Sequence, residues 1–373
     1  MVISPPVVAV NAAIVGERPT GLGVYALRVI EALAALGERL VVHTSIPEAI
    51  TPRGIEIRRA PPAVRPERGL RGNLARLLWT QTGLRAALRR DRPALLLSMV
   101  PEAPLFPPVP QIVTVLDVIP LRYARGYPRQ RHYFRYWVPA VLRHSRVLIT
   151  ISDASRRDIV RFYGVPPEKI HVAPCGYDAR RFAPDGPIAV VGEPYALYVG
   201  SIMPHKNLLR MVDAFAQAMG EGPGRLLIRG WGRRPHVRAL RERIARQGLG
   251  SRVDWQPYAP PDDLPSLYRG ARMLLLPSLA EGFGLTALEA MACGTPVVTS
   301  NTSSLPEVVG DAALLVDPLD TAALAQGIAQ LFTNDRLVKD LRERGLARAP
   351  QFTWERTGRA VQGAIRAALT EAA

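Results

Sequence analysis

Residues Met273–Ser300, MLLLPSLAEGFGLTALEAMACGTPVVTS, contain in succession a strand, a loop, a helix and a second strand. Met273–Leu276 and Pro296–Ser300 have the length and largely apolar character of buried strands. Leu285–Cys293 has a helical pattern and follows a loop that contains two glycines. This strand–helix–strand order predicts a parallel sheet with helices on its faces.

The same alternation extends over both halves of the chain. The other strand candidates are Val7–Val10, Leu40–Thr44, Ile55–Arg58, Leu95–Ser98, Ile112–Leu116, Val147–Ile151, Ala196–Val199, Arg225–Arg229, Val253–Trp255 and Leu314–Val316. The other helix candidates are Val24–Leu36, a helix capped by Ser152 or Asp153 that runs to Tyr163, Asn207–Met219, Pro235–Gln247 and Trp354–Leu369. The proline- and glycine-rich segment Phe182–Pro194 has the character of a linker. We therefore predict an α/β chain with two doubly wound domains, residues 1–184 and 185–352, and a ligand in the cleft at the carboxyl ends of their strands.

Length and composition predict a cytoplasmic globular protein. The 373 residues suit two domains, and no apolar run reaches the roughly 18 residues that a membrane-spanning helix needs. The N-terminus has no basic segment ahead of an apolar core, which argues against a signal peptide. Two cysteines, Cys175 and Cys293, are too few for a disulfide framework or a cysteine metal cluster.

The net charge of +16 is unevenly distributed. Residues 1–184 contain 27 Arg and Lys against 13 Asp and Glu, whereas residues 185–373 contain 21 against 19. One interpretation is an anionic partner of the N-terminal half, such as a membrane surface, a phosphorylated acceptor or nucleic acid. The other is a compositional preference for arginine, because 45 of the 48 basic residues are Arg.

Two glycines and one carboxylate in the loop before the Leu285 helix, with a second carboxylate in that helix, mark a candidate ligand site. Gly282 and Gly284 allow close approach of the backbone, and the first helical turn offers N–H groups and a positive dipole end to a phosphate. Glu281 could bond sugar hydroxyls, and Glu289, one to two turns into the helix, could accept hydrogen bonds from a ribose diol. The alternative is an ordinary helix start with a solvated acidic residue.

Lys206 is a further candidate, in the loop Gly200–Asn207 between a strand and a helix. A cation is unfavourable at a helix N-terminus unless an anion lies near it, so Lys206 could face a diphosphate. The alternative is a surface lysine. The sequence contains no Asp-x-Asp, His-x-x-His or Cys-x-x-Cys motif, and it therefore predicts no metal and no other cofactor.

The N-terminal half contains weaker candidates. Gly21 and Gly23 belong to the predicted glycine-rich loop Thr20–Gly23 after the first strand, where a packing role is an equal interpretation. No acidic residue follows a second strand near residue 44, so a dinucleotide site is not favoured. Asp117 follows the strand Ile112–Leu116 and could hold a hydroxyl or help an acceptor lose its proton, although it could also cap a helix or turn.

Taken together, these residues resemble the retaining glycosyltransferases of family 4, which have the GT-B fold of two Rossmann-like domains facing a central cleft. The resemblance extends over nearly the whole chain. Its most specific part, Glu281–Val298, matches the E-x7-E motif of that family and the strand after it. The supporting matches are Ile151–Ser155, Gly164–His171, Tyr198–Asn207 and Ser304–Asp311.

The resemblance implies roles for individual residues. Glu281 would contact the transferred sugar, Glu289 would contact the ribose, and Lys206 would bind the diphosphate. With the position of Asp117 after its strand, this predicts Glu281 and Asp117 as the catalytic residues. The other residues near the donor would be Gly21, Gly23, Ser201, Gly282, Phe283, Gly284 and Leu285. The helix in residues 353–373 would cross back onto the N-terminal domain.

Three positions depart from the pattern of the family. Ser201 stands where the family often has Arg, so that one phosphate contact would be missing or would come from another arginine. Leu116 stands where the family often has His, which leaves Asp117 without the neighbour that often contacts the sugar. Cys175–Asp178 reads Cys-Gly-Tyr-Asp in place of the common Asn-Gly-Val-Asp.

The resemblance also implies an activity and partners. It predicts transfer of a hexose with retention from a nucleotide-sugar, GDP-mannose ranked first, to a glycan or lipid-linked acceptor in polysaccharide biosynthesis. Nucleotide-sugar 2-epimerases of the same fold are an alternative, and a non-enzymatic protein that binds anions or nucleic acid is another. Nucleic acid is not the expected partner. The basic segments Arg65–Arg92 and Arg122–Arg146 could make peripheral contact with an anionic membrane on the inner face of the cell.

Overall fold

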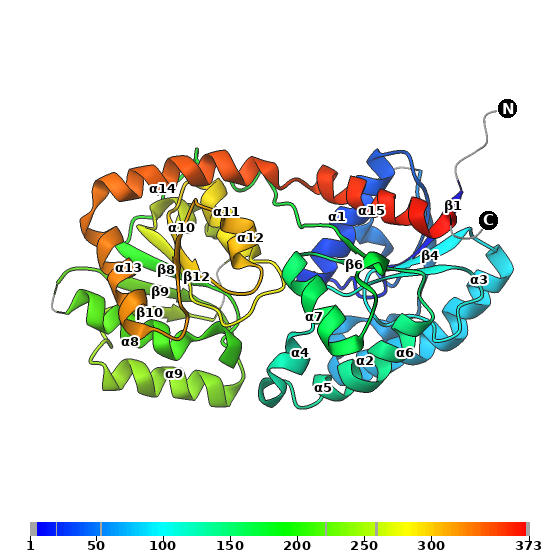
Figure 1. The fold of residues 1–373 in the computed structure, drawn as a ribbon, viewed down its shortest axis with the longest axis horizontal. Helices are drawn as coiled ribbons and strands as arrows, with labels where there is room; N and C mark the ends of the chain where they lie inside the picture. Colours follow the sequence, from blue (N-terminus) through cyan, green and yellow to red (C-terminus); the bar gives the residue numbers. More distant parts are fainter. Residues whose placement is uncertain (1–5, 20, 53, 221, 258–259, 371–373) are drawn as a thin grey trace. The chain divides into compact units, whose positions relative to one another are not determined.

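The computed structural model describes residues 6–370 except 20, 53, 221, 258 and 259 (Figure 1). It divides into two compact units, one made of residues 1–176 and 354–373 and the other of residues 177–353. The segment predicted as a linker, Phe182–Pro194, lies in the second unit. There the Arg269 guanidinium donates to the carbonyls of Ala183 (3.1 Å) and Pro187 (2.7 Å). The division between the units thus falls before this segment, whereas the sequence placed it between residues 184 and 185.

The first unit contains a seven-stranded parallel sheet in the order β3-β2-β1-β4-β5-β6-β7. Its strands are β1 (Val7–Asn11), β2 (Arg39–Thr44), β3 (Glu56–Arg59), β4 (Leu95–Ser98), β5 (Gln111–Thr114), β6 (Val147–Thr150) and β7 (Ile170–Val172). β4, β5 and β6 are buried along their whole length, as expected where helices cover both faces of a parallel sheet. β7 was not predicted, because three residues with His171 in the middle are too short for an apolar pattern.

Helices of the first unit come from both ends of the chain. They are α1 (Gly21–Ala35), α2 (Gly69–Trp79), α3 (Arg85–Asp91), α4 (Ile119–Arg122), α5 (Gln130–His132), α6 (Val138–Arg143), α7 (Asp153–Tyr163) and α15 (Trp354–Thr370). The π-helical turns η4 (Thr80–Leu84) and η6 (Tyr133–Trp137) join α2 to α3 and α5 to α6. The prediction of a loop over Thr20–Gly23 was wrong for the described part of that segment. Gly21–Gly23 form the first turn of α1, because Gly23 and Tyr25 already belong to the buried face of that helix.

α15 returns to the first unit and packs against α1 (Figure 1). Thr357 Oγ1 donates to the carbonyl of Pro174 at 2.6 Å, and the Trp354 ring meets the Tyr25 ring edge-on, with centroids 6.2 Å apart. A Cβ on Gly358 would lie only 2.6 Å from Ala32 Cβ, so a glycine allows the two helices to approach closely.

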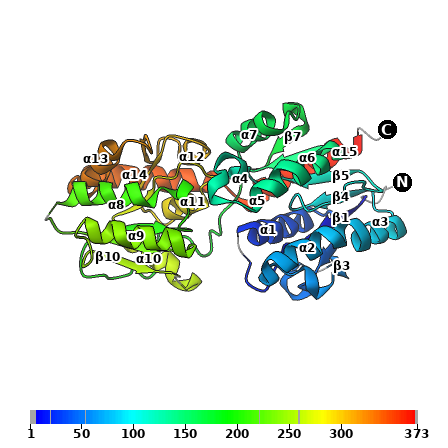
Figure 2. The ribbon, with the colours of Figure 1, turned by 90° about the horizontal axis from the view of Figure 1, so that it is seen from below.

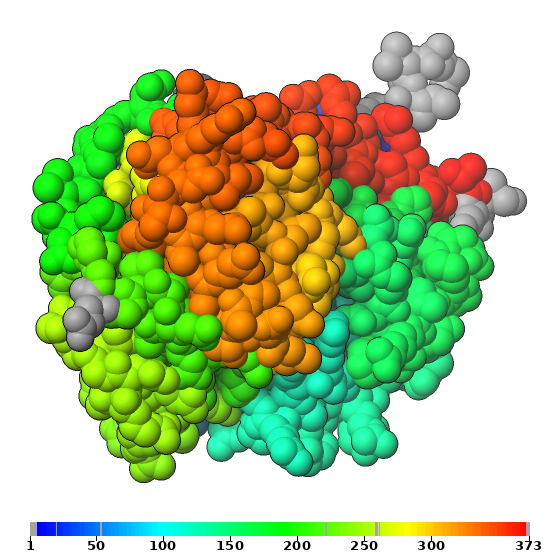
Figure 3. Space-filling model, turned by 60° about the vertical axis from the view of Figure 1, so that its left-hand side comes forward, coloured from blue at the N-terminus to red at the C-terminus, as the bar shows by residue number. Residues whose placement is uncertain are grey.

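The second unit contains a six-stranded parallel sheet in the order β10-β9-β8-β11-β12-β13. Its strands are β8 (Tyr195–Val199), β9 (Arg225–Arg229), β10 (Val253–Gln256), β11 (Met273–Leu276), β12 (Val297–Ser300) and β13 (Leu314–Val316). Its helices are α8 (Leu208–Met219), α9 (Arg234–Arg246), α10 (Leu264–Gly270), α11 (Leu285–Ala292), α12 (Leu305–Val309), α13 (Thr321–Thr333) and α14 (Asp335–Arg348). α8 packs against α9 and α13, and α11 packs against α10 and α14. α9 and α13 form much of the surface of the second unit that Figure 3 shows.

Both sheets confirm the predicted α/β class with two doubly wound units. In each sheet the order of strands changes direction between two central neighbours, β1 and β4 in the first unit and β8 and β11 in the second. The loops after such a pair of strands lead to opposite sides and leave a crevice at the carboxyl edge, where ligands of these sheets bind. None of the helices in the described ranges has the length and apolar character needed to cross a bilayer.

Candidate active site

Two loops follow the central strands of the second unit, residues 200–207 after β8 and residues 277–284 after β11. Hydrogen bonds join them directly. Asn207 Nδ2 donates to the carbonyl of Pro277 at 3.1 Å, and the N–H of Leu279 donates to the carbonyl of His205 at 2.7 Å. Asn207 has a left-handed backbone (φ 62°), which asparagine adopts more readily than most residues. The two loops therefore hold their side chains in a common frame.

Lys206 and Glu281 come from these two loops and form an ion pair. Lys206 Nζ lies 2.6 Å from each carboxylate oxygen of Glu281, and Ser278 Oγ donates to Glu281 Oε1 at 2.7 Å. The two charged side chains are 17% and 10% exposed. Because both charges are largely withdrawn from water, removal of one partner would cost about 3–5 kcal/mol. The structure thus brings together two predicted site residues that are 75 positions apart.

The positive charge of the loop after β8 comes from Lys206 rather than from its neighbour His205. His205 is buried, and burial, followed by the charge of Lys206, lowers the pKa of its imidazole to about 4. The ring is therefore neutral near pH 7. Ser201, which stands where the family often has Arg, is half-buried, and its carbonyl accepts a hydrogen bond from the Tyr198 hydroxyl at 2.9 Å.

Two serines in the loop after β12 hold the backbone of Glu281. Ser303 Oγ accepts from the N–H of Glu281 at 3.2 Å and donates to its carbonyl at 2.7 Å. Ser304 Oγ lies 3.0 Å from the Glu281 carbonyl and 2.7 Å from the Phe283 carbonyl. Neither these serines nor Ser278 was among the predicted site residues. Their position just beyond a strand, at the carboxyl edge of the sheet, is a signal that could have identified them.

Gly284 makes the turn from the loop into α11. Its φ is 114°, a backbone conformation that favours glycine, and a Cβ there would also lie 2.8 Å from Leu305 Cδ2. Phe283 is buried, with its ring edge-on to that of Phe352 at 5.8 Å. Within the described residues no side chain caps α11 at this position. The first turn, which begins at Leu285, therefore offers the unpaired main-chain N–H groups of a helix start.

Glu289 lies in α11 and is bonded to Tyr268 of α10. The Tyr268 hydroxyl donates to Glu289 Oε2 at 3.2 Å. Glu289 keeps partial exposure, but protein surrounds it closely enough that burial raises the pKa of its carboxyl to about 7, against the opposing effects of Tyr268 and Arg181. Burial also raises the pKa of Tyr268 well above its usual value, so the phenol stays neutral and can donate. Tyr268 was not predicted, because a tyrosine inside a short helix carries no motif of its own.

Asp117, Gly21 and Gly23 lie in the first unit, whereas the contacts of Lys206 and Glu281 are internal to the second. Asp117 follows β5, as predicted, and its Oδ1 accepts from the N–H of Ile119 at 3.0 Å. Asp117 therefore caps the turn into α4. Gly21 is exposed at the start of α1, and Gly23 is buried, with Pro19 at close range.

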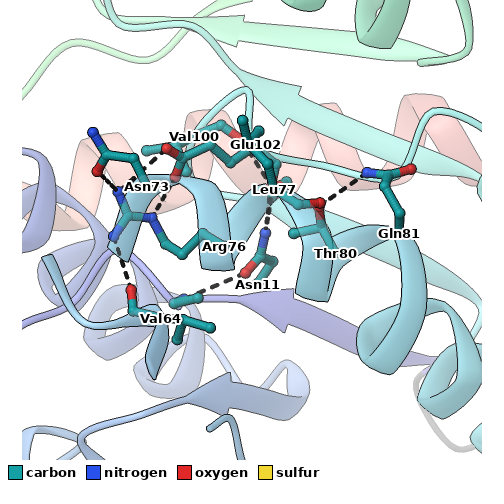
Figure 4. A network of polar contacts seen from close by, with 11 residues as sticks. Asn11, Val64, Asn73, Arg76, Leu77, Thr80, Gln81, Val100 and Glu102 are labelled. Carbon is teal, nitrogen blue, oxygen red and sulfur yellow. Dashed lines mark hydrogen bonds and ion pairs between the residues drawn. The ribbon is translucent and has the colours of Figure 1, made fainter. Parts of the chain in front are cut away.

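A polar network joins the carboxyl ends of β1 and β4 to α2 in the first unit (Figure 4). Asn11 Nδ2 donates to Ser98 Oγ (2.9 Å) and to the carbonyl of Glu102 (2.8 Å). Arg76 of α2 is 3% exposed, and its guanidinium donates to the Glu102 carboxylate at 2.7 and 3.3 Å and to the carbonyl of Val64 at 2.8 Å. These residues were not predicted, since they are far apart in sequence. The network fixes α2 and the loop after β4.

The site in the second unit has the chemistry to bind an anion and hydroxyl groups. Lys206 and the start of α11 suit an anionic group, and the carboxylates of Glu281 and Glu289 suit hydroxyl donors. Across the described ranges no group of three or more His, Cys, Asp or Glu side chains is placed to hold a metal ion.

Two family models match the chain. The model described as Glycosyltransferase Family 4 matches residues 19–181, and the model described as Glycosyl transferases group 1 matches residues 184–348. The O-antigen chain mannosyltransferase B of Escherichia coli is 35% identical over 65% of this chain and 67% of the relative. The D-inositol 3-phosphate glycosyltransferase of Acidothermus cellulolyticus is 34% identical over 60% of this chain, and the match spans 54% of the relative, or about half of its length.

Solved structures of the same fold cover nearly the whole chain. Sucrose-phosphate synthase from Thermosynechococcus elongatus superposes with a TM-score of 0.76 over 99% of this chain and 100% of its own, at 23% identity. The Anabaena protein HepE, solved with UDP and glucose, has a TM-score of 0.73 over 97% and 99% of the two chains, at 18% identity. The fold is thus GT-B. The family matches identify a transferase rather than a non-enzymatic binding protein, and this chain belongs to the glycosyltransferases that the family 4 and group 1 models describe.

Proposed function

We propose that this glycosyltransferase transfers a hexose, with retention of configuration, from a nucleotide-sugar to a glycan or lipid-linked acceptor. The observation that carries the proposal is the pairing of Lys206 with Glu281 at the crevice of the second unit. This pair offers a cation for a diphosphate and a carboxylate for sugar hydroxyls within one frame. GDP-mannose ranks first as donor, supported by the mannosyltransferase from E. coli and by the MMP α-(1→4)-mannosyltransferase of Mycolicibacterium hassiacum, which is 32% identical over 58% of this chain.

In the proposed mechanism the leaving diphosphate lies at Lys206 and the first turn of α11. The bond between the anomeric carbon and the phosphate oxygen breaks, and charge that builds up on the leaving oxygen is stabilised by the ammonium and the N–H groups. The acceptor hydroxyl forms the new bond on the same face, and its proton passes to the leaving phosphate. Glu281 holds hydroxyls of the sugar, and Glu289 accepts hydrogen bonds from the ribose.

The first unit contains further proposed reaction residues, Asp117 and the glycines of α1. We propose that Asp117 orients the acceptor hydroxyl and that Gly21 and Gly23 allow the backbone to approach the donor. Ser201 would contribute its N–H or hydroxyl where the family often has Arg. No metal is proposed, since Lys206 and the α11 N-terminus would offset the charge of the diphosphate. The proposed location is the cytoplasmic side of the cell membrane, with peripheral contact through the basic first unit.

A donor screen tests the proposal. The melting temperature of the protein is measured with GDP-, UDP-, dTDP- and ADP-sugars, because a ligand that binds only the folded state raises it. The stabilising donor is then incubated with acceptors, and the anomeric configuration of the product is determined by NMR. Glu281→Gln should reduce transfer by at least about 100-fold, as expected on removal of a group that acts in the transition state. Near-normal transfer by this variant would refute the role of Glu281.

Incubation with the donor alone separates transfer from epimerisation. A 2-epimerase needs no acceptor and converts the nucleotide-sugar, whereas a transferase leaves it unchanged apart from slow hydrolysis. Conversion of the donor to its 2-epimer would contradict the proposed reaction.

A further inference from the structure

α2 of the first unit carries an exposed row of leucines. Leu70, Leu74 and Leu78 are 53%, 58% and 67% exposed, and their spacing of four residues places them along one side of the helix. The opposite side is held by Arg76, which is 3% exposed and bonded to Glu102, so the helix does not depend on the leucines for its attachment. A continuous apolar row on the surface indicates an interaction site.

Arginines are frequent on α2 and in the segments next to it in sequence. Residues 65–92 contain seven Arg besides the buried Arg76, and two acidic residues, Glu67 and Asp91. Residues 118–152, which include α4, α5 and α6, contain seven Arg and no Asp or Glu. α2, α5 and α6 all lie along the lower side of the first unit in Figure 1, and Figure 2 looks onto that side. η6, between α5 and α6, adds Tyr136, whose ring is 65% exposed.

The combination of apolar and cationic side chains identifies the occupant. A second copy of this chain would bring the same arginines, and like charges would oppose the contact. A nucleic acid would use the arginines but would leave the leucines in water. An anionic bilayer uses both, because leucines enter the boundary of the acyl chains while guanidinium groups stay among the headgroups. We propose that the leucine row of α2, together with the neighbouring arginines, docks this protein on an anionic lipid surface.

Docking through this row specifies the membrane contact that is part of the proposed function, and its biological purpose rests on that function. The docking itself needs neither the sugar donor nor the acceptor. The first test is co-sedimentation of the full chain with two kinds of vesicle. One contains phosphatidylcholine alone, and the other also contains about 30 mol% phosphatidylglycerol, which gives the vesicle a clear negative surface potential. The wild-type protein should bind the anionic vesicles. It should bind the neutral ones at least about tenfold more weakly, since several arginines each contribute roughly fivefold.

The decisive variant is Leu70→Gln/Leu74→Gln/Leu78→Gln. It leaves the net charge of the protein unchanged, and glutamine, like leucine, favours a helix. It should weaken binding to anionic vesicles by at least about tenfold, because three apolar side chains no longer enter the interface. The matched control is Ile188→Gln/Val190→Gln/Leu319→Gln, three residues of the second unit that are 62%, 92% and 65% exposed. It should bind like the wild type. An equal loss in both variants, or none in the first, would overturn the proposal.

Arginine variants and self-association complete the test. Arg68→Gln/Arg71→Gln should weaken binding at low salt, whereas Arg234→Gln/Arg246→Gln at the two ends of α9 should not. Sedimentation velocity should show that the wild-type protein does not dimerise through the leucine row. A wild-type dimer that is lost in the leucine variant would mean that the row binds a second copy of the chain. Transfer to a water-soluble acceptor should be equal in wild type and leucine variant. Normal transfer without any vesicle binding would reject the docking surface and leave the proposed reaction intact.

Discussion

Ser303 holds both polar groups of the Glu281 peptide backbone with a single hydroxyl, accepting from its N–H at 3.2 Å and donating to its carbonyl at 2.7 Å. Ser303 has a left-handed backbone (φ 59°), which is unfavourable for a residue with a Cβ. The chain thus tolerates local strain at a position whose hydroxyl fixes the backbone of Glu281. Strain of this kind is often found at functional sites.

Ser303→Gly separates the effect of the backbone strain from the effect of the hydrogen bonds to Glu281. Glycine relieves a strain of roughly 1 kcal/mol, which offsets much of the roughly 1–2 kcal/mol lost with the hydrogen bonds. The melting temperature should therefore change by only a few degrees, while kcat for sugar transfer falls about tenfold or more, since small displacements of a catalytic group are costly. Calorimetry and steady-state kinetics measure both quantities.

The control for this variant is Arg92→Gly in the first unit. Arg92 also has a positive φ (44°), but it lies outside the proposed active site, so its replacement should relieve strain without loss of kcat on a water-soluble acceptor. Wild-type kcat in Ser303→Gly would show that the serine does not position Glu281.

The ion pair between Lys206 and Glu281 should couple the two residues in stability as well as in activity. Lys206→Met and Glu281→Gln each leave the other group without its partner at a largely buried position, so each should lower the free energy of unfolding by about 3–5 kcal/mol. The double variant should lose much less than the sum of the two, because neither charge remains. Denaturant unfolding of all four proteins measures the coupling.

Activity distinguishes the site from a purely structural pair. The double variant should regain stability but remain inactive in transfer. Arg243→Met/Asp213→Asn, which removes an ion pair between α9 and α8, should retain activity. A double variant with substantial transfer activity would contradict the proposed use of this pair.

Replacement by alanine should have opposite effects on stability at two glycines of α15. Gly358→Ala places a Cβ 2.6 Å from Ala32 Cβ, so α1 and α15 must separate, at a cost of about 1–3 kcal/mol. Gly363→Ala meets no atom within 4 Å and should stabilise the helix by roughly 0.5–1 kcal/mol. Thermal unfolding of both variants checks the pair, and equal shifts would show that α15 does not pack closely on α1.

Periodic and motif-bearing parts of the chain were predictable from the sequence. Arg225–Arg229, Met273–Leu276 and Leu314–Val316 were predicted with the bounds found in the structure, because each is a short run flanked by turn residues. The loop positions of Lys206 and Glu281 also followed from the pattern, since ligand-binding loops come after strands in parallel sheets. Their contact did not, because it depends on the order of strands in the sheet, which places β8 beside β11.

Residues without a local pattern could not be predicted. Ser303 acts through its hydroxyl on a backbone 22 positions away, and Tyr268 acts on a carboxylate 21 positions away. The start of α1 at Gly21 was missed for a related reason. Glycine disfavours a helix locally, and the burial of Tyr25 and its neighbours, which outweighs that preference, is a property of the packed unit.

Glu289 makes stability and ligand binding depend on pH in opposite ways. The pKa of its carboxyl is raised from 4.5 to about 7, so the folded protein retains a proton that the unfolded chain loses between these values. The stability contributed by Glu289 is therefore complete below pH 4.5 and is lost as the pH rises to about 7. Glu289→Gln should be more stable than the wild type above pH 7, with the difference vanishing toward pH 4.5.

Binding of GDP should follow the ionised form, because a carboxylate accepts hydrogen bonds from the ribose more strongly than a carboxylic acid does. The Kd from titration calorimetry should rise as the pH falls below about 7. Tyr268→Phe removes a hydrogen bond that favours the ionised carboxylate, so it should raise the pKa of Glu289 and move the midpoint to higher pH. Tyr195→Phe also removes a hydroxyl from the same unit, one that donates to the Leu267 carbonyl at 2.8 Å, and it should leave the midpoint unchanged. A common shift in both variants would mean that lost packing, and not the bond to Glu289, sets the pH dependence.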